Sequence, residues 1–249
     1  MIILSEFYKQ LIEPIPSDLT IIDVIQGEGW TLVESELGAG LAMTYKGGLN
    51  TSLYKNWIGH PVKNLALQVN SWNFLEASLG LAAINSFWNT KITLENKFGD
   101  YSLETKLHLL EYLDAAQQAN KKIVSVGHFP FLDKLNQKVT ILEMNPIRAN
   151  EYPSTAAEYL IPGCNIILIT GSTVINKTFE SISRLIGGST SWLIGPSTPL
   201  TPQFKNYRID FLGSLLVQDS KLVKQLIRSG ARRELMTCAG IRKTDVTLR

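Results

Sequence analysis

The sequence predicts an α/β protein made of two consecutive units, an α+β unit over residues 1–95 and a parallel α/β unit over residues 96–249. In the first unit, three β-rich runs separated by glycines come before any long helical pattern. In the second, short and wholly apolar runs alternate with helical stretches. The length of 249 residues is enough for two modest domains, and 45% hydrophobic with 18% charged residues is ordinary for a soluble protein.

The first unit is expected to open with a short helix and continue as an antiparallel sheet. Residues 4–12 carry apolar positions at helical spacing and end before Pro14 and Pro16, which break a helix. Glycine-containing turns then separate three β-rich runs, a pattern typical of a meander. We expect these strands at residues 20–25, 30–34 and 41–45, and helices at residues 52–57, 62–68 and 72–87.

A change of pattern separates the two units. Residues 89–101 are polar and aperiodic, and we interpret them as a linker or an excursion between the units. Beyond them, wholly apolar strands alternate with helices, which is typical of a parallel sheet covered on both faces, as in Rossmann-like domains. The strands are expected at residues 123–126, 139–142, 165–169, 191–194 and 211–217, and the helices at residues 103–119, 170–185 and 221–229.

The composition excludes several classes of protein. Glu6 and Lys9 interrupt the apolar start before a signal peptide develops, and no apolar stretch approaches the ~18 residues of a membrane span, so we expect a cytoplasmic protein without a membrane partner. Cys164 and Cys238 show neither disulfide nor zinc spacing. The chain from Lys221 onward is basic but lacks interleaved aromatic residues. Nucleic-acid binding is therefore not expected, and we interpret this tail as a solvated helix face with a homo-oligomer contact.

Candidate site residues follow the ends of the predicted parallel strands, where open α/β sheets bind ligands. The loop Gly127-His128-Phe129-Pro130 replaces the GxGxxG fingerprint, which argues against a nicotinamide dinucleotide. His128 could bind metal or move a proton, although a lone histidine is more often structural. Glu143 follows the next strand, where an acid commonly holds a ribose or another hydroxyl-rich group. It could equally cap a turn.

Two further loops and one helix supply other candidates. Thr170, Gly171 and Ser172 offer hydroxyls and amides that could hold an anion or cap a helix, with Asn176 farther along. The loop 195–199 places hydroxyls between prolines, which suits a rigid wall. In the first unit, Asn73 and Glu76 could face a cleft or cap their helix, and small residues on the stripe of Glu76, Gly80 and Ala83 permit close packing.

Five sequence blocks, in order across most of the chain, carry a family resemblance: SWNFLEASLGLAAINSFWN, VGHFPF, LEMNP, ITGSTVINKT and IGPSTPLTP. Together they resemble the family known as the "putative heavy-metal chelation" domain. The resemblance implies an enolase-N-terminal-like first domain, a Rossmann-like second domain and a site between them, in a family without an established activity. Its blocks fall on Asn73, Glu76, Gly80, Asn85, Gly127, His128, Phe129, Pro130, Glu143, Thr170, Asn176, Gly195, Pro196, Thr198 and Pro199.

Three functions follow as hypotheses. The first is binding of a metal ion, metal chelate or small anionic ligand between the domains, with His128 and Glu143 as candidate ligands of a divalent metal. The shortage of cysteine near these loops argues against a soft thiolate site. The second is an enzyme acting on a small organic anion, with Glu143 or His128 as general acid or base and the Thr170 and Gly195 loops holding the anion. The third is a ligand sensor that oligomerises through its basic tail.

Overall fold

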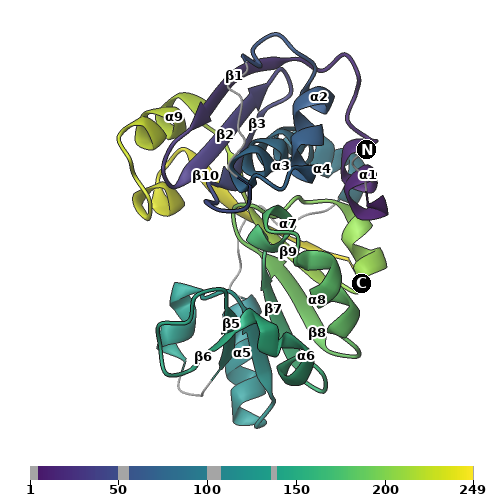
Figure 1. Cartoon of the computed structure of the whole chain (residues 1–249), viewed down its shortest axis with the longest axis vertical. Helices are drawn as coiled ribbons and strands as arrows, with labels where there is room; N and C mark the ends of the chain where they lie inside the picture. The colour runs from purple at the N-terminus through teal and green to yellow at the C-terminus, as the bar shows by residue number, and fades with distance from the viewer. Residues whose placement is uncertain (1–4, 50–55, 100–107, 136–138, 249) are drawn as a thin grey trace.

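The computed structural model describes residues 5–49, 56–99, 108–135 and 139–248, which form two β-sheets with helices packed around them (Figure 1). One sheet has three strands in the order β1-β2-β3. The other has seven, in the order β10-β9-β8-β7-β4-β5-β6. The chain is therefore a mixed α/β protein, as the sequence predicts. None of the helices in the described part of the chain has the length and apolarity to cross a membrane.

The first sheet is the predicted antiparallel meander. It consists of β1 (Ile21–Gln26), β2 (Trp30–Ser35) and β3 (Ala39–Met43). One face is covered by α3 (Phe74–Trp88), and two shorter helical segments pack against α3: α2 (Val62–Ala66) and η1 (Leu67–Asn70). The helix expected at residues 52–57 lies largely outside the described residues.

The expectation of an irregular segment at residues 89–101 is wrong, because most of these residues form helix α4 (Lys91–Phe98). Thr90 caps this helix by accepting a hydrogen bond from the amide of Thr93, Leu94 is fully buried, and Gly99 ends it at φ +65°. Few apolar residues are needed to anchor a helix of two turns, so no hydrophobic period was visible in the sequence.

The second sheet has the strand order of a Rossmann fold plus one antiparallel edge strand. The parallel strands are β4 (Ile123–Val126), β5 (Thr140–Glu143), β6 (Glu151–Pro153), β7 (Ile166–Thr170), β8 (Thr190–Ile194) and β9 (Phe211–Val217), and β10 (Ile241–Thr247) pairs antiparallel with β9. The sequence did not reveal β6 and β10. Both are edge strands, which carry polar residues and leave little apolar signal.

Helices cover both faces of this sheet, as the wholly apolar strands predict. Ile166 and Leu168 pack with α5 (His108–Gln118), whereas Ile167 and Ile169 share a core with α8 (Phe179–Leu185). The helix expected over residues 170–185 is interrupted after α7 (Ser172–Ile175), because Lys177 adopts a left-handed φ of +69°. The remaining short helix on this side is α6 (Ala157–Leu160).

Segments from both ends of the chain tie the two sheets together. Phe7 of α1 (Glu6–Ile12) stacks on Phe179 and contacts Phe204, so one hydrophobic core runs from α1 into the second sheet's helices. Helix α9 (Ser220–Arg228) follows the second sheet in sequence but packs against β1 and β2 of the first (Figure 1). The three-stranded sheet is therefore covered by α3 on one face and by the C-terminal segment on the other.

Lys224 fixes α9 to the meander through two ion pairs. Its Nζ lies 2.8 Å from Asp23 Oδ2 and 2.7 Å from Glu34 Oε2, and all three side chains are mostly buried. Hydrogen bonds to both carboxylates raise the pKa of Lys224. Burial by itself raises the pKa of Asp23. The hydrogen bond from Lys224 and its positive charge outweigh this effect and hold the pKa of Asp23 below its usual value.

We expect the substitution Lys224→Met to lower the free energy of unfolding by about 1 kcal/mol at pH 7, because two carboxylates lose their shared partner. Urea unfolding would measure this. The difference should shrink as the pH falls through the lowered pKa of Asp23, since stability from a depressed carboxylate is lost on protonation. Lys221→Met on the same helix is the control. An equal loss in both variants would contradict the pairing.

Candidate functional site

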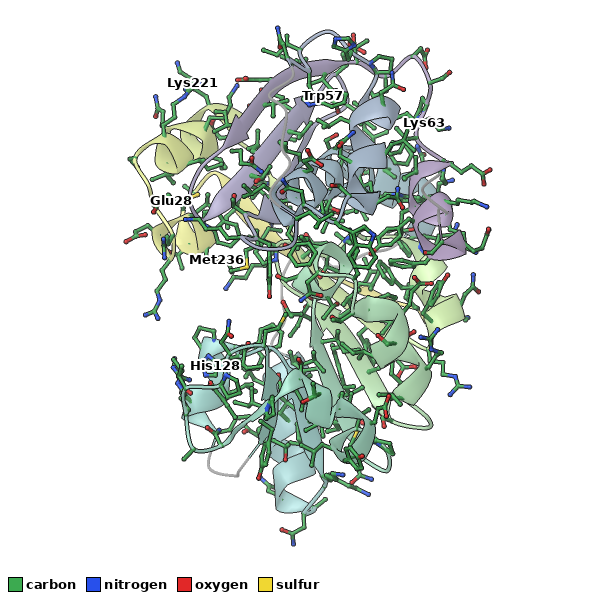
Figure 2. The ribbon with its side chains drawn as sticks, in the orientation of Figure 1. Glu28, Trp57, Lys63, His128, Lys221 and Met236 are labelled. Carbon is green, nitrogen blue, oxygen red and sulfur yellow. The ribbon has the colours of Figure 1, made fainter. Side chains whose placement is uncertain are left out.

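A cleft of about 1110 Å³ lies between the two sheets, at the carboxyl ends of β4, β5 and β7. Strand β4 is followed along the chain by β5 on one side, while β7 lies on its other side, so the strand order reverses here. Such a switch point leaves a crevice in an open parallel sheet. Glu28 of the first sheet and His128 of the second stand on opposite sides of the cleft (Figure 2).

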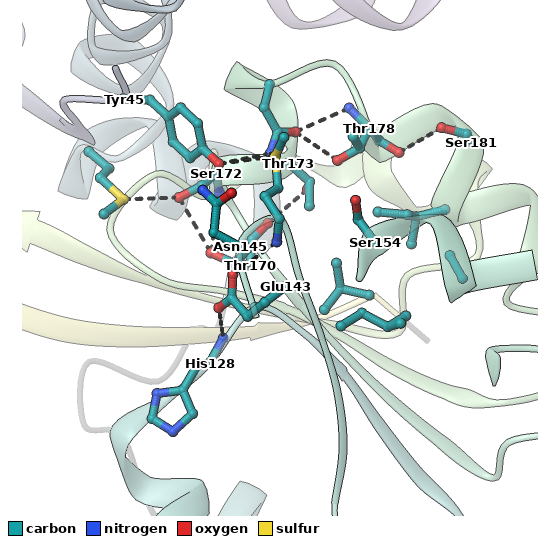
Figure 3. A pocket seen from close by; sticks show the side chains of 18 of the residues that line it. Tyr45, His128, Glu143, Asn145, Ser154, Thr170, Ser172, Thr173, Thr178 and Ser181 are labelled. Carbon is teal, nitrogen blue, oxygen red and sulfur yellow. Dashed lines mark hydrogen bonds between the residues drawn. The ribbon is translucent and has the colours of Figure 1, made fainter. Parts of the chain in front are cut away.

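The floor of the cleft depends on close packing between the ends of β4 and β7. Gly127 has φ +95°, and a Cβ there would lie 2.8 Å from Thr170 Cγ2. Only glycine combines this backbone with that contact at low cost. Beside it, the hydroxyls of Thr170 and Ser172 are 3.4 Å apart, and Thr173 donates to the Thr170 carbonyl (Figure 3). A row of hydroxyl groups therefore faces the cleft.

Glu143 and His128 meet through backbone rather than through their functional groups. The Glu143 carboxylate accepts hydrogen bonds from the amides of His128, at 2.7 Å, and Met144, at 3.3 Å. The imidazole of His128 points away from this carboxylate (Figure 3). Glu143 thus ties the ends of β4 and β5 together and still borders the cleft.

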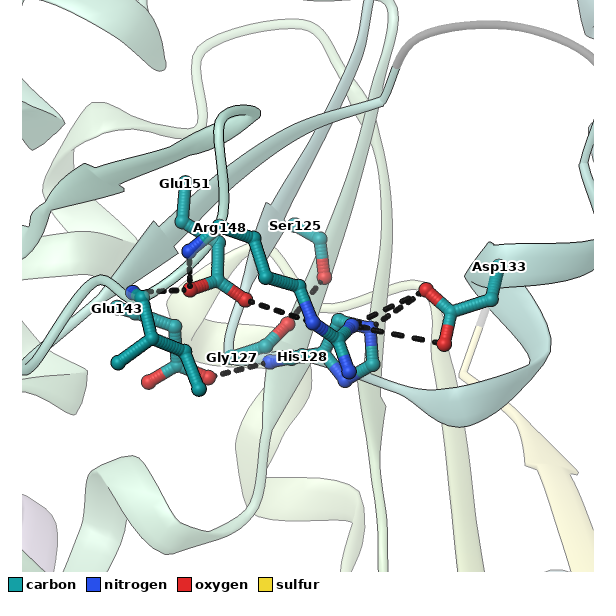
Figure 4. A network of polar contacts seen from close by, with 8 residues as sticks. Ser125, Gly127, His128, Asp133, Glu143, Arg148 and Glu151 are labelled. Atoms are coloured by element: carbon teal, nitrogen blue, oxygen red, sulfur yellow. Dashed lines mark hydrogen bonds and ion pairs between the residues drawn. The ribbon is translucent and has the colours of Figure 1, made fainter.

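The imidazole of His128 instead joins a charged network on the rim (Figure 4). Its Nε2 lies 2.9 Å from Asp133 Oδ1, and Arg148 contacts both residues, with Nη1 3.1 Å from the same carboxylate oxygen. The hydrogen bond with His128, and the charges of His128 and Arg148, hold the pKa of Asp133 below its usual range. This network orients the loop that follows β4.

The proposed roles of His128 and Glu143 as metal ligands stay predictions. Their side chains do not converge on one point, and within the described residues no group of three or more His, Cys, Asp or Glu side chains is arranged to hold a metal ion. The same two residues as general acid and base also remain a prediction.

Of the residues predicted to bind a ligand, six line the cleft: Gly127, His128, Glu143, Thr170, Ser172 and Asn176. The other eight lie outside its lining: Asn73, Glu76, Asn85, Phe129, Gly171, Gly195, Pro196 and Thr198. Most of these eight have a structural partner.

In the first unit, the polar candidates serve helix α3. Asn73 caps it by accepting a hydrogen bond from the amide of Leu75, and Glu76 accepts one from Ser71. Asn85 is fully buried and donates to the Leu41 carbonyl, which joins α3 to β3. The capping interpretation of Asn73 is therefore the correct one.

In the second unit, several candidates form a layer behind the cleft wall. A Cβ on Gly171 would lie 2.6 Å from the amide nitrogen of Thr198, so these two loops pack backbone to backbone. Ser197, in the same loop as Gly195 and Pro196, accepts a hydrogen bond from the Met43 amide at 2.8 Å. The loop thereby positions β3 of the first sheet. Phe129 stacks on Phe131 in the core beneath α5.

The sequence missed the side of the cleft that the first sheet and the C-terminal segment supply. The residues involved are Glu28, Trp30, Met43, Thr44, Tyr45, Lys46 and Arg232. Arg232 Nη2 lies 3.2 Å from Glu28 Oε2, and the Trp30 indole donates to the Arg232 carbonyl. Glu28 stands in the turn between β1 and β2. Arg232, some 200 positions away, gives no local signal of this contact.

These features define a class: an α/β unit with the strand order of a Rossmann fold, joined to a small antiparallel unit, with a cleft lined by polar and apolar side chains at the strand switch. Residues 111–244, more than half of the chain, match a family described as "Putative heavy-metal chelation", and residues 8–88 match a second family with the same description. The chain therefore belongs to the family described as "Putative heavy-metal chelation". No curated protein matches it.

Two solved structures are similar over nearly the whole chain. A protein of unknown function from Desulfitobacterium hafniense, of the family matched by residues 111–244, is 27% identical, with 97% of this chain and 98% of that chain covered and a TM-score of 0.83. A second member of unknown function, from Pyrococcus horikoshii, is 24% identical, with 99% and 100% covered and a TM-score of 0.77. Both share the two-unit fold.

Proposed function

We propose that the protein binds a metal chelate, a metal ion already held by a small organic molecule, in the cleft between the two sheets. The observation that supports this most is the lining of the cleft. Nine neutral hydroxyl and amide side chains line the part formed by the second sheet and its helices: Asn145, Ser154, Thr155, Thr170, Ser172, Thr173, Asn176, Thr178 and Ser181.

Hydroxyl and amide groups both donate and accept hydrogen bonds, which suits the carboxylates, hydroxyls and amines of an organic ligand. The cleft, at about 1110 Å³, is as large as a generous small-molecule pocket. A bare ion with ligands at roughly 2.0–2.6 Å would fill only a small part of it. A chelating molecule around the ion accounts for the remaining volume.

The charges at the cleft are mixed in sign. The lining includes acidic and basic side chains: Glu28, Glu143, Glu158, Lys46, Arg184 and Arg232. The backbone amides that hold the Glu143 carboxylate fix its position while leaving further lone pairs for a ligand hydroxyl or amine. A metal complex has a cationic centre and anionic ligand groups. The acidic side chains could interact with the first and the basic side chains with the second.

The test is a thermal-shift assay with divalent ions alone and as citrate or histidine complexes, with metal analysis of protein purified without chelators. A ligand at 100 times its Kd stabilises the folded state by about 2.7 kcal/mol. We expect at least one complex to raise Tm by roughly 5–10 °C, the shift that this energy gives in a chain of this size. The free ion should raise it less.

Variants locate the site. Ser172→Leu should abolish the shift because it places an apolar side chain among the cleft hydroxyls, and Glu143→Gln should weaken it. His128→Ala should have the smaller effect, since its imidazole points toward Asp133. Glu13→Gln, at an exposed position away from the cleft, is the control. If the free ions raised Tm as much as their complexes, the proposal that the ligand is a chelate would be refuted. If Ser172→Leu and Glu143→Gln both kept the full rise in Tm, the proposed location in the cleft would be refuted.

A further inference from the structure

We infer that Met43 and Met144 form a thioether subsite for a soft monovalent cation, of the class of Cu(I) and Ag(I), within the cleft. This inference rests on the proposed function in one respect, because it names the kind of metal that the cleft would favour. Its evidence is separate, since neither methionine belongs to the row of hydroxyl and amide groups.

Both methionines lie at the cleft and are partly exposed. Met43, at the end of β3, is 43% exposed, and Met144, directly after β5, is 46% exposed; both line the cleft. Methionine is usually used to fill gaps in a core. Two half-exposed methionines, one from each of the two sheets that border the cleft, are therefore available to a ligand.

The two sulfurs contact residues one helical turn apart. Ser172 Oγ donates to Met43 Sδ at 3.5 Å, and Asn176 Nδ2 donates to Met144 Sδ at 3.4 Å. The backbone N–H of Asn176 also donates to the backbone carbonyl of Ser172, so both residues lie on one side of α7. Positions four apart on a helix are separated by about 5–6 Å. Met side chains have three rotatable bonds, so both sulfurs can turn onto one ion between them.

Hydroxyl groups stand where they can complete the site. Tyr45 Oη donates to Met144 Sδ at 3.2 Å, and its ring is held edge-on by Phe74. Tyr45 and Ser172 both point into this part of the cleft (Figure 3). A hydroxyl that donates to sulfur can rotate and offer its oxygen to a cation instead. Thioether sulfur is a soft ligand that selects Cu(I) over hard divalent ions.

Methionine sulfur thus supplies what cysteine does not. Cys164 is buried, and burial raises the pKa of its thiol, which keeps it protonated. Cys238 is half-buried and outside the cleft lining. A soft-metal preference in this cleft would therefore come from its thioethers.

The experiment is titration of the full chain, with Cys238→Ser to remove the accessible thiol, by silver nitrate, followed through the ¹³C-labelled methionine methyl groups by NMR. We expect the signals of Met43 and Met144 to shift together and saturate at one Ag(I) per chain, with Met236 unchanged. Met43→Leu and Met144→Leu, which conserve volume, should each weaken binding about tenfold or more, because one of two sulfurs is lost. Met236→Leu is the matched control.

Independent saturation of the two methyl signals, or full affinity after either substitution, would overturn the shared subsite. An equal shift at Met236 would show nonspecific thioether binding and overturn it too. If a divalent chelate raises Tm equally in the wild type and in Met43→Leu, the proposed function is supported and the selection of a soft metal by the methionines is not. If Ag(I) binds to Met43 and Met144 but no metal chelate raises Tm, the methionine subsite is supported and the proposed chelate binding is not.

Discussion

The variant Gly80→Ala is expected to lose about 3 kcal/mol of unfolding free energy, the upper end of what overpacking costs, or to fail to accumulate as folded protein. A Cβ at Gly80 of α3 would lie 2.0 Å from the amide nitrogen of Val69 and 2.8 Å from its Cα. The obstacle is backbone of η1, which cannot rotate away, so the helix and η1 must separate and open their buried interface. The ~1 kcal/mol that alanine gains in helix propensity does not offset this.

Urea unfolding at pH 7 measures the effect, with Gly188→Ala as the control. Nothing lies within 4 Å of a Cβ at Gly188, and its φ is not in the left-handed region. The control should therefore match the wild type within about 0.5 kcal/mol. Stability of Gly80→Ala within 1 kcal/mol of wild type would contradict the packing of α3 against η1.

Lys177 is expected to make stability rise with pH in the alkaline range. Its ammonium reaches from the turn between α7 and α8 to the carbonyl of Val69 and lies 5.1 Å from the centre of the Tyr8 ring. Burial lowers the pKa of Lys177 from 10.5 to about 8. Between these values the unfolded chain holds a proton that the folded chain has lost, so the free energy of unfolding increases as pH rises from about 8 to 10.5.

The substitution Lys177→Met isolates this contribution. Between pH 7 and pH 10.5, the free energy of unfolding of the wild type should rise by about 3 kcal/mol relative to that of the variant, since each pKa unit corresponds to about 1.4 kcal/mol. Burial, followed by the charge of Glu180, raises the pKa of Tyr8, so its hydroxyl stays protonated in the folded state throughout. Urea unfolding at several pH values, with Lys205→Met at an exposed position as the control, gives the comparison. A constant difference between wild type and Lys177→Met would rule out the lowered pKa.

The elements with strong apolar periodicity were predictable. The strands β4, β7, β8 and β9 are buried runs whose position depends on composition alone, and the glycine-separated meander followed from local turn chemistry. The errors fell where a few contacts decide the structure. Helix α4 is anchored by Leu94 and its Thr90 cap, and the break at Lys177 depends on one left-handed residue.

The candidate site was predictable only from the side of the parallel sheet. Strand-end positions such as Thr170 and Ser172 can be recognised because all parallel strands end at the same edge. Asn85 and Thr198 were placed in the site by family blocks, yet they are fully buried and support its walls. Sequence blocks do not distinguish a residue that lines a cleft from one that holds the lining in place.

The sequence by itself determined the α/β class, the Rossmann-like second unit and the loops where a ligand could meet it, because local periodicity and turn residues specify strands and helices. Tertiary structure alone decided that α9 covers the first sheet, that His128 turns toward Asp133 rather than Glu143, and that Met43 and Met144 share a cleft. These arrangements join residues up to about 200 positions apart. They depend on packing and charge pairing between surfaces, which no short stretch of the chain encodes.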